Sequence, residues 1–397
     1  MVPGKRTRRG SAARLAAAAA AVVLAASACS DDGGDDDPGK AAAQTPVSSG
    51  AVPPGAPGTS GVPGAPGPTA SGVPKAAVTG DVVTGLDSPW GVAPLPDGDV
   101  LVASRDDGTV SRFRPGTPGL TEVGKVPGSQ HSGEGGLLGL ALSPDFARDG
   151  WVYVYTTTGD DNRILRMKYA RETGLTSPEV LFTGIPSGGR HNGGRIAFGP
   201  DGMLYAGTGE AGDEPLSQDR DSLGGKILRL TPEGKPAPGN PFPGSPVYSL
   251  GHRNVQGLAW DSAGRLWAAE FGQNEWDEVN LITPGSNYGW PVVEGIAKDP
   301  KYVDPLVQWS TGEASPSGIA IVDDVVYVAA LRGERLWQVP IQGDRLGEPT
   351  ALFEGKYGRL RTVLPAPGGG LWVATNNTDG RGDARAGDDR ILQVSLT

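Results

Sequence analysis

The chain has 397 residues, with 35 Lys plus Arg, 45 Asp plus Glu and a formal net charge of −10. A general nucleic-acid binder is expected to be basic, so this charge excludes that class, although a local basic pocket for a small anion stays compatible with it. Gly (63) and Pro (36) make about a quarter of the residues, a density that only a turn-rich β fold or a disordered chain tolerates. The single Cys and three His exclude an internal disulfide, a Cys-based metal site and a His-rich metal cluster.

Residues 1–29 have the organisation of a secretory signal peptide. Basic residues at positions 5–9 precede an apolar run, Leu15 to Ala26, that is too short to span a membrane as a helix. The segment from Leu24 to Cys29 resembles a bacterial lipobox, in which the Cys is diacylated, although Ala26 stands where a larger aliphatic residue is usual. Ordinary cleavage near Ala28 is the alternative. We expect an exported protein that a lipid on Cys29 anchors to the extracellular face of the cell membrane.

Residues 30–77 predict a disordered stalk. An acidic run is followed by Pro, Gly, Ala, Ser and Thr with almost no large apolar side chain, so the segment cannot bury enough surface to offset the entropy lost on ordering. The folded domain is expected to occupy residues 78–397.

Within that domain, one pattern of a turn followed by an apolar strand occurs six times. The copies begin at Asp97, Asp149, Asp201, Ala263, Asp323 and Gly368. Their spacing, roughly 45–62 residues, is the size of a four-stranded blade. We therefore predict an all-β fold, a six-bladed β-propeller of four-stranded antiparallel blades without a long helix. Small Gly and Ala residues in the first strand of each copy suit the crowded propeller axis; a β-sandwich with chance similarity is the alternative.

Three Gly-rich connections carry the first candidate site residues. Residues 133–139, 190–195 and 251–257 precede the first strands of the second, third and fourth copies, so they are expected to converge at one mouth of the channel. Glycine there lets the backbone approach a ligand closely. The connections supply Glu134, His191, Arg253 and Asn254, and Glu210 follows one strand after His191.

Two further groups indicate ligands. Residues 269–278 are dense in oxygen ligands without Cys, which suits Ca²⁺; a solvated acidic loop is the alternative. Arg332, Arg359 and Arg361 are expected at the same propeller end, and the last two alternate, so both point to one face of a strand. Arginine grips carboxylates and phosphates bidentately, which favours an anionic ligand. The alternative is that Arg361 pairs with a local Asp.

At these residues the chain resembles the soluble glucose/sorbosone dehydrogenase family, whose members use pyrroloquinoline quinone (PQQ). The resemblance covers roughly residues 80–396. The segments that carry it are Gly-Leu-Leu-Gly at 136–139, His-Asn-Gly-Gly-Arg at 191–195, Gly-His-Arg-Asn at 251–254, Asp-Glu-Val-Asn at 277–280 and Asn-Tyr-Gly-Trp-Pro at 287–291. Each segment alone is weakly specific, and their combination is strong.

The resemblance implies the catalytic roles. His191 stands at the catalytic base, which takes the proton of the sugar hydroxyl. Glu210 stands where the family has an Asp that orients this His. Arg253 and Asn254 match the pair that contacts the quinone, with the Arg polarising the carbonyl next to the carbon that receives hydride.

The resemblance also implies the cofactor and metal ligands. Arg359 and Arg361 match a pair that grips the cofactor carboxylates, and Arg332 stands where glucose dehydrogenase has Lys. Glu134 replaces a Gln near the substrate and is grouped here with the cofactor-binding residues. Backbone carbonyls of Gly272 and Gln273 would hold the calcium under the cofactor, and Glu278 and Tyr288 match a second, structural calcium site. These assignments rest on the following residues: Glu134, Gly272, Gln273, Glu278, Tyr288, Arg332, Arg359 and Arg361.

The sequence therefore predicts an enzyme that oxidises an aldose or related sugar hydroxyl by hydride transfer to PQQ, with Ca²⁺. An imidazole accepts the proton, a carboxylate fixes its tautomer and an arginine stabilises negative charge on the quinone oxygen. We expect a monomer that passes electrons to an unidentified acceptor. The alternatives are a non-redox carbohydrate-binding propeller at the cell surface, and a calcium-dependent lactonase-type hydrolase. A lactonase needs several carboxylates around a central metal, and here only Glu134 and Glu210 are expected at the channel.

Overall fold

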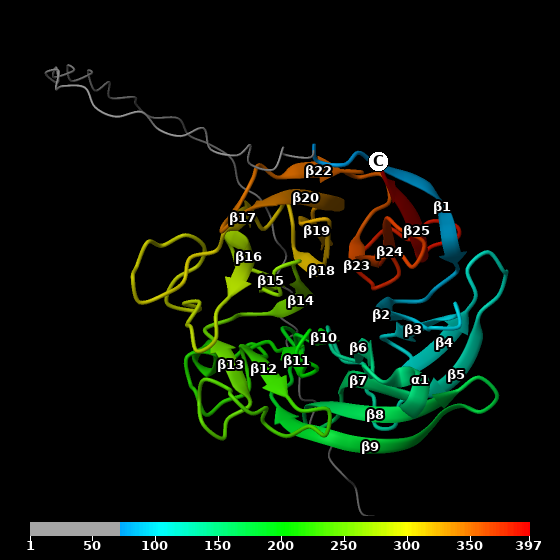
Figure 1. The fold of residues 1–397 in the computed structure, drawn as a ribbon, viewed down its shortest axis with the longest axis horizontal. Helices are drawn as coiled ribbons and strands as arrows, with labels where there is room; N and C mark the ends of the chain where they lie inside the picture. Colours follow the sequence, from blue (N-terminus) through cyan, green and yellow to red (C-terminus); the bar gives the residue numbers. More distant parts are fainter. Residues whose placement is uncertain (1–71) are drawn as a thin grey trace, which may run out of the picture. The chain divides into compact units, whose positions relative to one another are not determined.

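Short antiparallel strands account for almost all regular structure in residues 72–397, the part of the chain that the computed structural model describes. Six sheets surround a common axis, each with its first strand nearest the axis (Figure 1). The predicted six-bladed β-propeller is confirmed. The described helices are two single turns, α1 (Phe146–Asp149) and the 3₁₀ turn η1 (Glu214–Ser217). No described helix is long and apolar enough to cross a bilayer.

The first three blades follow each other along the chain without interruption, each with its strands in sequence order. The first contains β2 (Pro89–Pro94), β3 (Val100–Ser104), β4 (Thr109–Phe113) and β5 (Thr121–Lys125). The second contains β6 (Leu137–Leu142), β7 (Trp151–Thr157), β8 (Asn162–Ala170) and β9 (Gly174–Ile185). The third contains β10 (Ile196–Phe198), β11 (Leu204–Gly207), β12 (Lys226–Leu230) and β13 (Val247–Leu250).

The last three blades repeat the arrangement, with one addition and one closure. The fourth contains β14 (Val255–Trp260), β15 (Leu266–Glu270), β16 (Trp276–Ile282) and β17 (Val307–Ser310). The fifth contains β18 (Pro316–Val322), β19 (Val325–Ala330) and β20 (Arg335–Gln342), and β20 also pairs with the short β21 (Arg345–Leu346) and β22 (Thr350–Leu352). The sixth contains β23 (Leu360–Pro365), β24 (Leu371–Thr375), β25 (Arg390–Leu396) and β1 (Ala76–Thr84).

The N-terminal strand closes the ring. β1 pairs antiparallel with β25 as the outer strand of the sixth blade, and Lys75 and Thr397 exchange two main-chain hydrogen bonds beside it. Closure covers a sheet edge that would otherwise be free to pair with another chain. Pairing begins at Ala76, whereas the sequence placed the start of the domain at Val78. Most of the expected stalk, and the signal segment with Cys29, lie outside the described residues.

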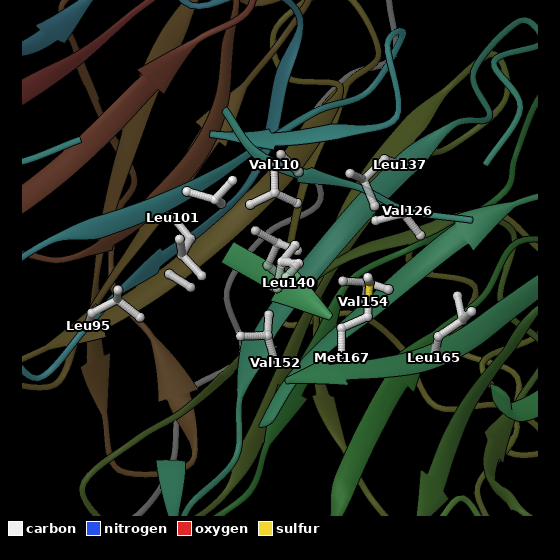
Figure 2. Packing of buried hydrophobic residues seen from close by; sticks show 14 residues of the cluster. Leu95, Leu101, Val110, Val126, Leu137, Leu140, Val152, Val154, Leu165 and Met167 are labelled. Atoms are coloured by element: carbon white, nitrogen blue, oxygen red, sulfur yellow. The ribbon is translucent and has the colours of Figure 1, made fainter. Parts of the chain in front are cut away.

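Aliphatic side chains fill the space between neighbouring blades. Figure 2 shows one such cluster, in which Leu101 and Val110 of the first blade pack with Leu140, Val152 and Val154 of the second. Full burial of each such side chain stabilises the fold by roughly 1.5–3 kcal/mol before conformational entropy is counted.

Near the axis the inner strands approach so closely that only small residues fit. A Cβ on Gly91 would lie 2.6 Å from the main-chain nitrogen of Leu140, and a Cβ on Gly257 would lie 2.5 Å from the carbonyl oxygen of Ser317. Both distances are shorter than van der Waals contact. The predicted reason for the small residues of the first strands is therefore confirmed.

Candidate active site

A cavity of about 270 Å³ lies at one end of the channel. Its walls come from the connections that precede the inner strands and from those that follow the second strands, because both leave an antiparallel blade at the same end. The lining residues are Arg105, Glu134, His191, Arg253, Asn254, Phe271, Gly272, Ser315, Leu331, Arg332, Arg359, Arg361 and Arg381. Six of them are arginine and one is a carboxylate. The expected convergence of the three Gly-rich connections is confirmed.

The His191 imidazole is held from both sides. Its Nδ1 lies 2.6 Å from Glu210 Oε1, and its Nε2 lies 2.9 Å from Arg253 Nη2. Because a guanidinium can only donate, Nε2 is the acceptor, and the ring hydrogen therefore lies on Nδ1, which donates it to Glu210. Glu210 is 1% exposed and His191 is 6% exposed. This arrangement places the acceptor nitrogen of His191 on the cavity wall, next to Arg253, and a general base requires such an acceptor.

Arg253 is fixed by the loop that follows β15. Its Nη2 donates to Gln273 Oε1 at 3.1 Å and its Nη1 donates to the Phe271 carbonyl at 3.2 Å, while its main-chain N–H donates to Glu270. Burial lowers the pKa of Arg253 below its ordinary value, although nearby carboxylates, Glu210 first among them, act in the opposite direction. The guanidinium is thus a rigid, poorly hydrated donor beside His191.

Asn254 ties the third and fourth blades together. Its Oδ1 accepts the N–H of Gly193 at 2.9 Å, from the connection that carries His191. In the connection that follows β11 of the third blade, the Glu210 N–H donates to the Arg253 carbonyl at 3.0 Å. The relative position of His191 and Arg253 is therefore set by main-chain contacts as well as by their own side chains.

Asp379 organises the arginines on another wall. Its Oδ2 accepts Arg359 Nη2 at 3.1 Å and lies 3.6 Å from Arg361 Nη2. Burial alone would raise the pKa of this carboxyl, but Arg359 and Arg361 hold it below its ordinary value. Burial lowers the pKa of Arg361 to about 9. The sequence alternative, an Asp partner for Arg361, is correct, and the same Asp also pairs with Arg359; the two side chains still line the cavity.

The strand placement of these arginines differs in detail from the prediction. Arg359 precedes β23, and the pairing of β23 with β24 shifts register between Leu360 and Thr362. The irregularity at Arg361 turns its side chain inward, where Nη1 donates to Gln256 Oε1 at 2.8 Å. Arg332 also lines the cavity, with an exposed side chain.

The loop that carries Gly272 and Gln273 is held by two carboxylates. Asp277 accepts the Gly272 N–H at 2.8 Å and the Ser315 N–H at 2.5 Å, and burial raises the pKa of Asp277 to about 6. Glu294 Oε1 accepts four successive main-chain N–H groups, those of residues 273–276, at 2.6–3.2 Å. The main-chain donors of this loop are thus already bonded to the protein, and its carbonyl oxygens are what it can offer a metal.

Glu278 and Tyr288, the residues predicted for the second metal site, are both buried. Glu278 accepts the Gly295 N–H and the Asn280 side-chain amide, and burial, then the charge of Glu270, raises its pKa to about 8. The Tyr288 hydroxyl donates to the Leu281 carbonyl and accepts the Thr283 N–H. Among residues 72–397 no three His, Cys, Asp or Glu side chains come together as a metal cluster.

His252 faces away from the cavity, although it stands next to Arg253 in the same motif. It is fully buried, with Nδ1 2.7 Å from Glu270 Oε2 and Nε2 2.8 Å from Ser249 Oγ, and its ring stacks on Tyr288. Glu270 thus joins this buried imidazole to the main chain of Arg253.

The sequence reasoning missed Arg105, Asp379, Arg381 and Glu294, and it gave Glu270 only as part of the oxygen-rich run 269–278. Arg105 and Arg381 follow the second strands of the first and sixth blades, the place that Glu210 holds in the third. That shared position is the signal that could have identified them.

Comparisons with known proteins identify the family to which the chain belongs. The family model for glucose/sorbosone dehydrogenase matches residues 86–385. The chain belongs to the glucose/sorbosone dehydrogenase family. Among family relatives, the aldose sugar dehydrogenase YliI of Escherichia coli is 31% identical over 332 residues, which is 74% of this chain and 89% of that protein. Quinoprotein glucose dehydrogenase B of Acinetobacter calcoaceticus is 33% identical over 256 residues, 56% of this chain and 54% of that protein.

A solved structure shares the whole propeller. The PQQ-bound form of an aldose sugar dehydrogenase from Streptomyces coelicolor is 61% identical, with a TM-score of 0.80, and the match covers 82% of this chain and 98% of that one. The family resemblance that the sequence motifs indicated is confirmed.

Proposed function

We propose that the protein oxidises an aldose or a related sugar at a hydroxyl-bearing carbon, using PQQ with Ca²⁺. The observation that carries this proposal is the His191 imidazole: its Nε2 accepts from Arg253 in the wall of a cavity rich in guanidinium groups, while its Nδ1–H is bonded to a buried carboxylate. Membership of the glucose/sorbosone dehydrogenase family supports the same reaction.

The cavity fits an anionic cofactor with carboxylate groups. Six guanidinium groups face one lining carboxylate, and Arg359 and Arg361 share the single carboxylate of Asp379. Within residues 72–397 the buried Nε of Arg361 has no hydrogen-bond acceptor. A carboxylate of PQQ would supply that acceptor, and arginine binds such groups through paired N–H donors. Asn254 and Arg332 complete the proposed cofactor contacts.

The proposed calcium ligands are the carbonyl oxygens of Gly272 and Gln273. Their loop has its N–H groups bonded to Asp277 and Glu294, which also place negative charge behind it. An all-oxygen environment of this kind suits Ca²⁺. Glu278 and Tyr288 would hold the second proposed ion, which would offset the burial of the Glu278 carboxyl.

When bound, PQQ supplies the hydride acceptor and Ca²⁺ supplies Lewis acidity. His191 exchanges the N–H of Arg253 for the sugar hydroxyl, and its Nε2 takes the hydroxyl proton. Glu210 keeps the Nδ1 hydrogen in place and stabilises the imidazolium that forms. Arg253, which stays bonded to Gln273 and Phe271, would donate hydrogen bonds to negative charge that develops on the quinone oxygen.

Export and a lipid anchor on Cys29 belong to the same proposal, because the basic start, the apolar run and the lipobox-like segment precede the propeller. An anchored enzyme would deliver electrons to an acceptor near the membrane.

The test is reconstitution of the purified full chain with PQQ and Ca²⁺, followed by dye reduction with a panel of aldoses. Aldose-dependent reduction that requires PQQ and is lost with a calcium chelator is the expected result. A chain that binds PQQ and reduces no dye with any sugar would contradict the proposal.

A further inference from the structure

Across the mouth of the cavity, an ion pair joins two blades that are not neighbours. Arg381 lies between β24 and β25 of the sixth blade, and Glu134 precedes β6 of the second. Arg381 Nη1 lies 2.8 Å from Glu134 Oε1, so the pair bridges the end of the first blade. The Arg381 side chain is 59% exposed and that of Glu134 is 21% exposed. Both residues line the cavity while remaining accessible to a molecule that enters it.

The same pair touches the proposed base. Glu134 Oε2 accepts the main-chain N–H of His191 at 2.9 Å. The main chain of Arg381 is fixed in turn, because its N–H donates to Asp379 Oδ1 at 2.9 Å. The ion pair therefore has a set position beside His191, in the wall of the cavity that a substrate would occupy.

Glu134 carries a negative charge at this position. Burial alone would raise the pKa of its carboxyl, but the His191 N–H and Arg381 hold it below its ordinary value. An ionised carboxylate only accepts hydrogen bonds and a guanidinium only donates them. Side by side, they match sugar hydroxyls, which do both. A substrate carboxylate or phosphate would instead meet Glu134, and the charge of Arg381 is already compensated.

We propose that Glu134 and Arg381 form the sugar-recognition pair of this cavity and that the pair selects neutral aldoses over sugar acids and sugar phosphates. This inference rests on the proposed function, since it names the substrate class of that site. It also moves Glu134 from the cofactor, with which the sequence grouped it, to the substrate.

Removing one charge of the Glu134–Arg381 pair is expected to shift the preference between neutral and anionic sugars, in opposite directions for the two residues. Glu134→Gln keeps an oxygen for the His191 N–H but leaves Arg381 without its carboxylate, so the mouth becomes positive. Arg381→Met leaves the Glu134 carboxylate without its guanidinium partner, so a substrate beside it meets an uncompensated negative charge. A charge-assisted hydrogen bond changes affinity by about 10- to 100-fold. The ratio of kcat/KM for glucuronate to that for glucose is expected to rise by about that factor in Glu134→Gln and to fall about tenfold in Arg381→Met.

Two matched controls change the same charges outside the cavity. Glu179→Gln and Arg148→Met each remove an exposed partner of an ion pair, Glu179 paired with Arg166 and Arg148 paired with Asp145. Neither residue lines the cavity. Both controls are expected to keep the glucuronate-to-glucose ratio within about twofold of the unmodified chain, an order-of-magnitude margin for surface charges.

A binding measurement separates this inference from the proposed function. In chains that also carry His191→Gln and are loaded with PQQ and Ca²⁺, calorimetry gives the dissociation constants of glucose and glucuronate without turnover. Opposite shifts of their ratio in Glu134→Gln and Arg381→Met support the pair, even where the unmodified chain oxidises no aldose and the proposed function fails. An unchanged ratio in both variants overturns the inference, even where the chain is an active aldose dehydrogenase. Because the Arg381 side chain is exposed, Arg381→Met is expected to fold even where Glu134→Gln does not. One variant then still tests the inference.

Discussion

Replacing Glu210 by Gln tests how the protein prepares His191. The side chain keeps its length and stays buried, but an amide can present N–H instead of an oxygen to Nδ1. Where that N–H faces Nδ1, the ring hydrogen moves to Nε2 against the Arg253 donor, and the imidazole can no longer accept a proton from a substrate. Where the amide oxygen faces Nδ1, the tautomer is kept, but the negative charge that stabilises the imidazolium is lost. The hydrogen bond from His191 Nδ1 to Glu210 Oε1 is short, 2.6 Å, and the two residues are at most 6% exposed, so solvent cannot replace it.

The expected loss follows from that geometry. A hydrogen bond to a charged group contributes about 1.5–3 kcal/mol, and each 1.36 kcal/mol is about tenfold in rate, so loss of the bond alone lowers kcat about 10- to 150-fold. The wrong tautomer extends the loss toward about 10⁴-fold. PQQ affinity should stay within about threefold, because Glu210 is not among the residues that line the cavity.

The assay is dye-coupled turnover at saturating PQQ, Ca²⁺ and aldose, with PQQ affinity and the melting temperature measured on the same preparations. Glu210→Asp retains a carboxylate, which the family has at this position, and should recover most of the lost rate. Turnover of Glu210→Gln within threefold of the unmodified chain, with PQQ bound and the fold intact, would refute the tautomer argument.

Three other predictions concern the cofactor, the anchor and the fold. Arg361→Ala should weaken PQQ binding by about 10- to 100-fold in an equilibrium titration, because it removes a buried donor pair; unchanged affinity would show that this arginine does not hold the cofactor. Cys29→Ala should release the protein from the membrane fraction or leave it unprocessed, whereas unchanged membrane association would exclude the lipid anchor. Lys226 Nζ donates to the carbonyls of Leu216, Ser217 and Gly224. Lys226→Met removes this buried partner, so it should reduce the free energy of unfolding by about 2–4 kcal/mol in a urea titration. Burial lowers the pKa of Lys226 to about 8 from 10.5, so the folded state binds fewer protons than the unfolded state between these values; stability should rise with pH across this window, and Lys226→Met should lack that rise.

The blades were predictable because their signal is local. Each turn and the apolar strand after it repeat within a few residues, and Gly91 and Gly257 mark inner strands that admit no Cβ. The convergence of Glu134, His191 and Arg253 followed from one rule, that equivalent connections of successive blades meet at one end of the channel.

The remaining features depend on long-range contacts without such a repeat. β1 and β25 come from opposite ends of the domain sequence, and the sequence of β1 does not indicate which strand it pairs with. Asp379 and Arg381 lie in an irregular connection, so only the folded chain shows that they meet Arg359 and Glu134. His252 shares a motif with Arg253 yet faces inward, because Ser249 and Glu270 bind both of its nitrogens.

The central claim is that His191 takes the proton of the sugar hydroxyl. The most direct measurement is the rate at which an aldose reduces bound PQQ in a single turnover, compared between the unmodified chain and His191→Gln. Gln keeps a hydrogen-bonding side chain but cannot act as a base, and positioned acid–base groups contribute about 10²- to 10⁴-fold. We predict a rate at least about a hundredfold lower with PQQ and calcium affinities nearly unchanged. A variant that melts at lower temperature but keeps its rate per folded molecule would show that His191 is structural and would contradict this account.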